Sequence, residues 1–278
     1  MSIPIADTVA RLRTARDAMH GTVAVVPTMG ALHEGHAALI RAARAAADNV
    51  VVTVFVNPLQ FRPGEDLDEY PRTLEADAAL AESLGADLVF APSEEELYPR
   101  GRENVVKVHP RPTGEILEGA SRPGFFTGVL TVVAKLFHLV RPHYAAFGDK
   151  DYQQLAMVRS MVEDLDMDVE ILSVALVRDA DGIALSSRNA YLSAEERAAA
   201  LAIPRAVEAA QASPDPLAAA RAVLEAESGL EVDYATVLAP DFEAAPESGP
   251  ARLLIAAHVG TTRLIDNAPV TIGESNDA

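Results

Sequence analysis

The 278-residue sequence contains no cysteine, which excludes disulfides, thiolate metal sites and a cysteine nucleophile. Basic side chains are also few. The 23 lysines and arginines stand against 41 acidic residues, giving a formal net charge of -18. Because such a charge repels phosphate backbones and acidic membranes, we expect neither nucleic acid nor a membrane as a partner. A small anion can still bind where basic groups converge.

Long apolar runs are missing as well. No stretch reaches the roughly 18 uninterrupted apolar residues of a membrane span. The best candidate, "GVLTVVAKLFHLV", is interrupted by Lys135 and His138. The N-terminal segment has no basic stretch followed by an apolar one, so no secretory signal is predicted. The expected location is the cytoplasm.

Apolar runs rich in β-branched residues alternate with helical patterns over the first part of the chain. Strands are predicted at residues 22–26, 49–56, 86–92, 143–148 and 168–177. Helices are predicted between them, including residues 36–48, 69–85 and 128–142. This alternation indicates βαβ units, and therefore a Rossmann-like α/β fold: a parallel sheet with helices on both faces.

The pattern changes after residue 177. Two helices are predicted at residues 192–212 and 215–229, and three strands at 230–238, 251–260 and 262–270. Such an arrangement is typical of a smaller α+β domain. We therefore predict two domains, residues 1–177 and 178–278.

Three polar motifs each begin where a predicted strand ends. They are "PTMGALHEGH" (27–36), "NPLQF" (57–61) and "GDKDYQQL" (148–155). In parallel sheets, ligands bind outside the carboxyl ends of the strands. The sequence therefore predicts that the three motifs meet in one crevice.

His33 and His36 stand at the predicted start of a helix, and their spacing leaves several roles open. The zincin motif H-E-x-x-H is absent, because "HEGH" is shorter. Another kind of metal site, or two histidines that only cap a loop, remain alternatives. The third alternative is phosphate binding: helix N-termini attract anions, Gly35 lets a polyphosphate approach, and imidazoles can donate hydrogen bonds.

The sequence has no P-loop and no convincing G-x-G-x-x-G, so ATP would have to bind by another scheme. "PTMGALHEGH" resembles the H-x-G-H signature of the nucleotidyltransferase superfamily. The segment resembles the pantoate–β-alanine ligase family more specifically. Five further segments resemble that family in its order: residues 54–61, 70–77, 147–155, 181–192 and 260–267. The resemblance extends from about residue 23 to residue 267.

This resemblance implies an ATP-dependent condensation of pantoate with β-alanine to pantothenate. The reaction would pass through pantoyl adenylate and release pyrophosphate and AMP. The resemblance further implies ATP as a substrate, Mg²⁺ as a cofactor, and a homodimer formed largely through the first domain. That domain would bind ATP and pantoate, and the second would be a lid.

The resemblance also assigns the site residues. ATP contacts are implied for Pro27, Thr28, Met29, Gly30, His33, His36, Gly148, Lys150, Asp151, Val177, Leu185, Ser186, Ser187 and Arg188. Catalytic roles are implied for His33, His36, Lys150, Ser186, Ser187 and Arg188. Pantoate contacts are implied for Met29, Asn57, Gln60 and Gln154, and the metal for Asp77.

The residue types suit these roles. Neutral amides can hold hydroxyl and carboxylate oxygens without quenching a nucleophile, while a lysine, two hydroxyls and a guanidinium suit phosphates. The sequence departs from the usual family pattern at four positions: Asp149 replaces glutamate, Leu185 methionine, Ala76 aspartate and Phe125 histidine. The last two departures affect the metal assignment and the "RPGFF" loop (122–126).

Other functions remain as alternatives. An adenylyltransferase would leave AMP in its product, whereas a ligase releases it. An aminoacyl-tRNA synthetase is disfavoured by the acidic charge and the absence of a separate RNA-binding region in the sequence. A non-catalytic ATP-binding regulator and a zinc hydrolase are the remaining classes.

Overall fold

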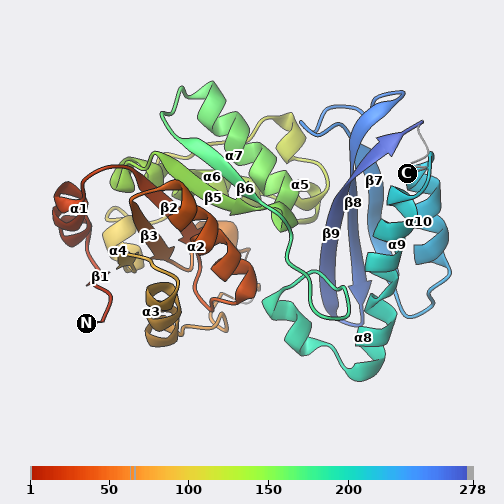
Figure 1. Ribbon diagram of the computed structural model, residues 1–278, viewed down its shortest axis with the longest axis horizontal. Helices are drawn as coiled ribbons and strands as arrows, with labels where there is room; N and C mark the ends of the chain where they lie inside the picture. The colour runs from red at the N-terminus through yellow and green to blue at the C-terminus, as the bar shows by residue number, and fades with distance from the viewer. Residues whose placement is uncertain (1, 63, 66, 274–278) are drawn as a thin grey trace. The chain divides into compact units, whose positions relative to one another are not determined.

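The computed structural model describes residues 2–62, 64–65 and 67–273 (Figure 1). The chain divides into two compact units. The first comprises Met1–Gly148 and Gln153–Val174, and the second comprises Asp149–Tyr152 and Ala175–Ala278. The turn that carries Lys150 therefore belongs to the second unit, although its neighbours in sequence belong to the first.

The first unit is built on a six-stranded sheet in the order β1-β4-β3-β2-β5-β6, with every pairing parallel. The strands are β1 (Ile5–Ala6), β2 (Val23–Thr28), β3 (Asn49–Val54), β4 (Leu88–Phe90), β5 (Tyr144–Gly148) and β6 (Glu170–Val174). The five predicted strands and the Rossmann-like parallel sheet are confirmed. The short edge strand β1 was not predicted, because two residues carry no periodicity.

The first unit contains seven α-helices within the part of the chain that the structure describes. They are α1 (Val9–Ala18), α2 (Glu34–Ala46), α3 (Leu74–Ser83), α4 (Glu94–Leu97), α5 (Glu118–Ser121), α6 (Phe125–Val140) and α7, whose bounds are Tyr152–Asp164. One face of the sheet packs against α2 and α3 through a core cluster that includes Val26, Val52, Ile40 and Ala81. Val25 and Val51 alternate with these strand residues and are also fully buried, so both faces of the sheet are covered. None of the helices in the described residues is long and apolar enough to cross a membrane.

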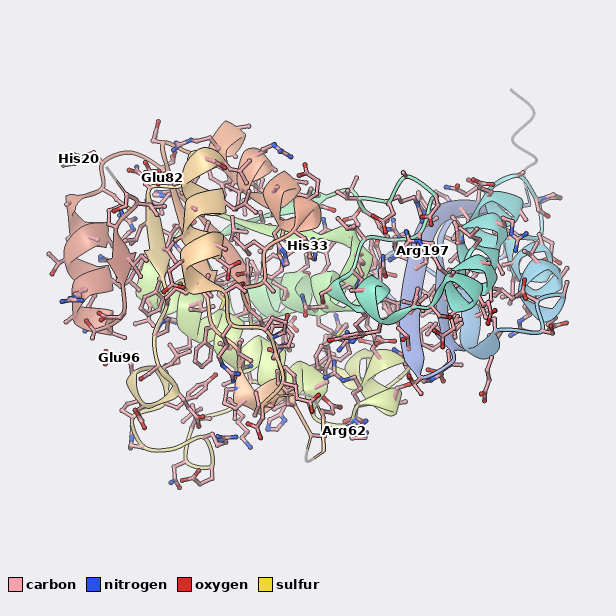
Figure 2. The ribbon with its side chains drawn as sticks, turned by 90° about the horizontal axis from the view of Figure 1, so that it is seen from below. His20, His33, Arg62, Glu82, Glu96 and Arg197 are labelled. Carbon is pink, nitrogen blue, oxygen red and sulfur yellow. The ribbon has the colours of Figure 1, made fainter. Side chains whose placement is uncertain are left out.

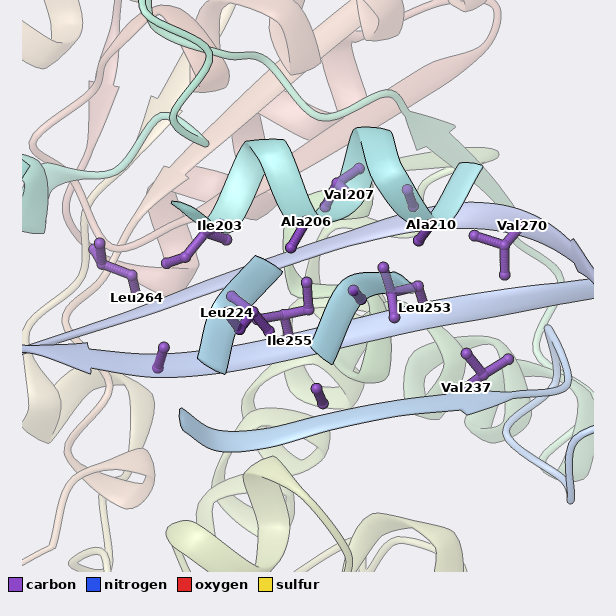
Figure 3. Close-up of a cluster of buried hydrophobic side chains, with 14 of the residues drawn as sticks. Ile203, Ala206, Val207, Ala210, Leu224, Val237, Leu253, Ile255, Leu264 and Val270 are labelled. Carbon is purple, nitrogen blue, oxygen red and sulfur yellow. The ribbon is translucent and has the colours of Figure 1, made fainter. Parts of the chain in front are cut away.

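The second unit contains an antiparallel sheet in the order β7-β8-β9 (Figure 1). Its strands are β7 (Glu231–Leu238), β8 (Gly249–Val259) and β9 (Thr262–Ile272), and its helices are α8 (Ala194–Ala200), α9 (Ala202–Gln211) and α10 (Pro216–Glu225). Figure 3 shows Ile203 and Val207 of α9 and Leu224 of α10 facing Leu253 and Ile255 of β8. The predicted smaller α+β part is confirmed.

Several predicted elements begin or end a few residues away from those observed, and two of these differences change the chain's course. The helix predicted at 192–212 is divided at Leu201 into α8 and α9. Pro204 explains the break, because proline lacks the N–H that a continuous helix would need there and is tolerated in a first turn. The strand predicted at 168–177 ends at Val174, and the chain then enters the second unit.

The strand order places a topological switch point beside β2. The chain continues from β2 to β3 and β4 on one side, then crosses back to β5 and β6 on the other. A crevice forms at such a point beyond the carboxyl ends of the strands. The motifs that follow β2 and β3 therefore start side by side, and β5 ends at Gly148 next to them.

Candidate functional site

The loop that follows β2 has an unusual backbone. Gly30 and Ala31 both adopt positive φ values, 88° and 50°. Ala31 is strained there, because a side chain disfavours the left-handed region. Thr28 fixes one end of the loop, since its Oγ1 accepts a hydrogen bond from Gly30 N at 3.2 Å. The loop ends at His33, the first histidine of the motif.

The carboxylate of Asp77 holds the same loop from the first turn of α3. Its Oδ2 accepts a hydrogen bond from Ala31 N at 3.1 Å, and its Oδ1 accepts one from Leu32 N at 2.8 Å. The hydroxyl of Thr73 lies 3.2 and 3.3 Å from the two oxygens. Asp77 is 2% exposed, so these bonds form in a dry environment where they are strong. Asp77 therefore anchors the strained loop that leads to the histidines.

These contacts do not fit the predicted role of Asp77 as a Mg²⁺ ligand. Both oxygens already accept hydrogen bonds, and Mg²⁺ needs oxygen atoms that can face it in octahedral geometry. Among the residues that the structure describes, no group of three or more histidine, aspartate or glutamate side chains could hold a metal ion. We derive no step through a metal bound to Asp77.

His33, labelled in Figure 2, and His36 cap the N-terminus of α2. Nδ1 of His33 accepts a hydrogen bond from Gly35 N at 3.1 Å, and Nδ1 of His36 accepts one from His33 N at 3.2 Å. The two rings lie 4.1 Å apart between centroids. This is a capping box made of two imidazoles instead of a hydroxyl and a carboxylate.

The capping bonds fix the chemistry of both rings. An imidazole nitrogen that accepts a hydrogen bond carries no proton, so the neutral tautomer of each histidine has its proton on Nε2. In the neutral form of each ring the N–H is therefore on Nε2, at the positive end of a helix dipole, which favours an anion. Capping and phosphate binding, which the sequence left as alternatives, are therefore compatible roles.

Three predicted pantoate residues lie together beyond β2 and β3. Nε2 of Gln60 lies 3.2 Å from Sδ of Met29, and Nδ2 of Asn57 donates to Oε1 of Gln60 at 3.0 Å. Met29 belongs to the histidine motif, so the predicted pantoate residues after β3 contact the loop that leads to the histidines. Gln154, the fourth predicted residue, lies half-buried in the first turn of α7.

Asn57 is held on all sides by protein groups. It is 1% exposed, its Oδ1 accepts hydrogen bonds from Tyr98 Oη and Leu59 N, and its Nδ2 also donates to the carbonyl of Gly128. Burial raises the pKa of Tyr98, which keeps this hydroxyl protonated as a donor. Asn57 therefore orients Gln60, and the role of Tyr98 was missed because a tyrosine 41 residues away carries no local signal.

The loop with Phe125 is joined to the pantoate residues by Arg122. The Arg122 guanidinium forms an ion pair with Glu65 at 2.6 Å, donates to the carbonyl of Gln60 at 3.2 Å, and stacks over the Phe125 ring at 4.1 Å. Phe125 thus contributes a face for the cation instead of the imidazole usual in the family. A cavity of 290 Å³ is lined by Gln60, Arg62, His109, Phe125 and their neighbours.

Acid should weaken the Glu65–Arg122 contact. Burial raises the pKa of Glu65, but hydrogen bonds from Arg122 and Arg62 outweigh burial and lower it to about 2. A depressed carboxyl pKa stabilises the fold above the unfolded-state value of about 4.3, and this stabilisation is lost as the pH falls towards 2. The free energy of unfolding of Glu65→Gln should therefore lie below that of the unaltered protein at pH 6.

We expect this difference to shrink by about 1 kcal/mol at pH 3.5, since the site is partly open to solvent. Urea unfolding of both proteins at the two pH values measures it. Exposed Glu75→Gln serves as the control. A difference between Glu65→Gln and the unaltered protein that does not change with pH would contradict the assignment.

In the second unit, Lys150 lies in a single turn, η3 (Asp149–Asp151). Lys150 Nζ lies 3.7 Å from Asp151 Oδ2, and the lysine is half-buried. The side chain of Asn267 on β9 donates hydrogen bonds to the carbonyls of Asp149 and Lys150, each at 2.9 Å. The backbone around Lys150 is therefore fixed by β9.

The predicted ATP residues at 177–188 form a hairpin followed by a short helical turn. Leu185 N donates to the carbonyl of Val177 at 2.9 Å, which pairs two of the predicted residues. Ser186 caps η4 (Ser187–Tyr191), its Oγ accepting a hydrogen bond from Arg188 N at 3.2 Å. Ser187 and Arg188 are exposed. This arrangement keeps a guanidinium and a hydroxyl accessible to a ligand.

Ion pairs of two arginines join the hairpin to α8 and to β9. Arg197 of α8 (Figure 2) bonds to Asp179 at 2.8 Å and to Asp181 at 2.7 Å. Hydrogen bonding from Arg197 lowers the pKa of Asp181. Arg178 pairs with Asp266 of β9 at 2.6 Å. Sequence reasoning missed these anchors, because each joins segments that are far apart in the chain.

The parallel sheet, its switch point and the polar residues beyond β2 and β3 are typical of α/β enzymes, which bind ligands at the strand ends. The chain belongs to the pantoate–β-alanine ligase family, whose family model matches residues 4–269. The predicted family and the enzyme class, a ligase, are confirmed.

Named relatives agree with this assignment. The pantothenate synthetase of Salinispora arenicola is 56% identical over 271 residues, covering 95% of this chain and 96% of the relative. The crystal structure of the pantothenate synthetase from Thermus thermophilus has a TM-score of 0.88 at 46% identity, covering 96% of this chain and 99% of that one. A pantoate-beta-alanine ligase from Francisella tularensis, complexed with beta-gamma ATP and beta-alanine, has a TM-score of 0.80 at 33% identity, covering 96% and 97%.

Proposed function

We propose that the chain condenses pantoate with β-alanine in two steps at the expense of ATP. A carboxylate oxygen of pantoate attacks the α-phosphorus of ATP, and the bond to the β-phosphate breaks, releasing pyrophosphate. The amine of β-alanine then attacks the carbonyl of pantoyl adenylate, loses a proton, and expels AMP. Neither step requires a covalent enzyme intermediate, which suits a chain without cysteine.

The observation that carries this proposal is the contact between Gln60 and Met29 at the start of the histidine loop. It places a neutral amide beside the loop whose histidines cap α2. An amide can hold pantoate through its oxygens without neutralising the attacking carboxylate. The proposed acid-binding amide thus contacts the segment that carries the proposed phosphate-binding histidines, and catalysis of in-line attack requires that the reacting groups be held close together.

Cationic and hydrogen-bonding side chains stabilise the charge that develops during transfer. The Nε2–H groups of His33 and His36 are donors to phosphate oxygens, in line with their capping bonds through Nδ1. We propose the same role, hydrogen-bond donation to phosphate oxygens, for Lys150, Ser186, Ser187 and Arg188. Such preorganised donors lower the barrier without reorganising during the reaction.

We also propose that Mg²⁺ is required and that it would bind together with ATP, through the phosphate oxygens. Mg²⁺ commonly keeps several waters and binds substrate phosphates with few protein ligands. This suits a chain in which Asp77, the ligand that the family resemblance implies, instead accepts hydrogen bonds from backbone N–H groups. We also propose the cytoplasm, where ATP is available, as the location, and a homodimer formed through the first domain, which light scattering would test.

The test is product analysis with ATP, Mg²⁺, pantoate and β-alanine, leaving out one substrate at a time. Free AMP should form only when all are present, and enzyme-bound pantoyl adenylate should accumulate when β-alanine is omitted. Lys150→Ala, purified in the same way, controls for contaminating ligases. A product that retains AMP would indicate an adenylyltransferase instead, and no turnover would indicate a binding protein.

A further inference from the structure

Two consecutive polar residues of β9 are buried but have no place in the mechanism above. Asp266 is 2% exposed and Asn267 is 4% exposed. They belong to "GTTRLIDN" (260–267), the segment of the family resemblance to which no function is assigned. Because successive side chains of a strand point to opposite faces, the pair reaches both sides of the sheet.

On one face of the sheet, both the oxygen and the nitrogen of the Asn267 side-chain amide form hydrogen bonds. Its Nδ2 donates to the carbonyls of Asp149 and Lys150, each at 2.9 Å. Its Oδ1 accepts from Nε of Arg252 at 2.8 Å, and from the adjacent guanidinium nitrogen as well. The amide therefore has one orientation, with oxygen towards the arginine and nitrogen towards the turn that carries Lys150.

Arg252 is itself fixed. It is 8% exposed, its guanidinium lies 3.9 Å from the centroid of the Tyr152 ring, and it lies 3.8 Å from Oδ2 of Asp149. Tyr152 donates to the carbonyl of Pro240 at 3.1 Å and stacks on Phe242. Residues of β8 and β9 thus contact both the turn that carries Lys150 and Tyr152, the residue that follows this turn.

On the other face, Asp266 holds the hairpin before Ser186. Its two oxygens accept from Arg178 at 2.6 and 3.0 Å, a two-point contact that fixes orientation. Arg178 also donates to the carbonyl of Gly182 at 2.9 Å, across the hairpin. Oδ1 of Asp266 accepts from Asn267 N at 2.7 Å, which joins the two contacts.

We propose that Asp266 and Asn267 are positioning residues that set the separation between two phosphate-binding elements, the Lys150 turn and the Ser186–Arg188 segment. Because successive side chains of β9 point to opposite faces, Asp266 holds the hairpin before Ser186 on one face and Asn267 holds the Lys150 turn on the other. This inference rests on the proposed function, because the phosphate-binding roles of Lys150 and Arg188 belong to it.

The test is a double-mutant cycle between Asn267→Asp and Lys150→Ala. Aspartate has the shape of asparagine and keeps the oxygen that accepts from Arg252. Its second oxygen, however, replaces the NH₂ group that donates to the carbonyls of Asp149 and Lys150, so it repels both carbonyl oxygens. The rate of pantoate-dependent ATP–pyrophosphate exchange should fall about 10- to 100-fold in Asn267→Asp, since small displacements of a reacting group have effects of this size. In the Lys150→Ala background the same substitution should lower the rate by less than about threefold, because coupled residues are not additive.

Asn104→Asp, an exposed change of the same kind, is the matched control and should leave the rate unaltered. If Asn267→Asp does not fold, Asn267→Ala replaces it in the cycle. A second cycle pairs Asp266→Asn with Arg188→Ala and should show the same non-additivity. Near-normal exchange in Asn267→Asp, or equal losses in both backgrounds, would overturn the proposal.

A failure of the positioning proposal can be distinguished from a failure of the proposed ligase function. If the unaltered protein gives neither exchange nor AMP, the ligase assignment fails on its own. The same cycles are then measured on the affinity for ATP by calorimetry. Non-additive losses of affinity would still support positioning, and additive losses or none would overturn it.

Discussion

Replacing His33 by asparagine should leave the protein folded but lower the rate of adenylate formation by about 10²- to 10³-fold, the loss expected when one preorganised donor is removed. Asparagine is among the best N-cap residues, so its side-chain oxygen can accept the bond that Nδ1 of His33 accepts from Gly35 N. The asparagine side chain is too short to replace Nε2 of His33 as a donor to a phosphate oxygen. The substitution therefore separates capping from chemistry.

Pantoate-dependent ATP–pyrophosphate exchange measures the rate, and thermal unfolding measures the stability. His33→Ala should show a similar loss of rate together with a loss of about 1 kcal/mol in stability, because alanine cannot cap. Exposed His20→Asn is the matched control (Figure 2). An exchange rate of His33→Asn within threefold of the unaltered protein would show that the histidine only caps the helix.

Asp77→Asn should lower both stability and the rate of adenylate formation. In asparagine an NH₂ group replaces one of the two carboxylate oxygens, so a donor would face either Ala31 N or Leu32 N, and that buried N–H would lose its acceptor. Such a loss destabilises by about 1–3 kcal/mol. The strained loop at Gly30 and Ala31 should then relax, and displacing His33 by about 1 Å should lower the rate about 10²-fold.

A metal titration separates this loop-anchoring role from the predicted metal-binding role. If Asp77 anchors the loop, raising Mg²⁺ or replacing it with Mn²⁺ should not restore the rate of Asp77→Asn. If Asp77 binds the metal, excess metal should restore a substantial part of the rate while stability stays near normal. Glu75→Gln removes an exposed carboxylate from the same turn of α3 and is the control.

The parts of the fold that could be predicted are those with a local signal. β2 and β3 are continuous runs of buried apolar residues, which is what a sheet covered on both faces requires. β1 has no such signal: it is a strand because the carbonyls of Pro4 and Ala6 accept bonds from Val89 and Ala91. The break at Leu201 does have a local signal, Pro204, but it was missed because the alanine-rich segments on both sides favour helix equally.

The same distinction applies to the site. The histidine motif and the residues after each strand could be found, because parallel strands bring their carboxyl ends together. The residues that anchor these segments, such as Asp77 and Tyr98, could not be found from the sequence. The family resemblance implied a metal-binding role for Asp77, whereas its carboxylate accepts hydrogen bonds from backbone N–H groups 45 and 46 residues away. The roles predicted for the individual ATP and pantoate residues stay predictions.

The two-sided contacts of β9 have a consequence for how this family can vary in length. Asp266 and Asn267 reach opposite faces only because of their parity along the strand. One residue inserted or deleted between Thr262 and Asp266 would exchange their faces, sending the amide towards Arg178 and the carboxylate towards the Lys150 turn. The loop between β7 and β8 lies outside the ladder and is free of this restriction. Length variation among relatives should therefore collect in that loop and avoid the first half of β9.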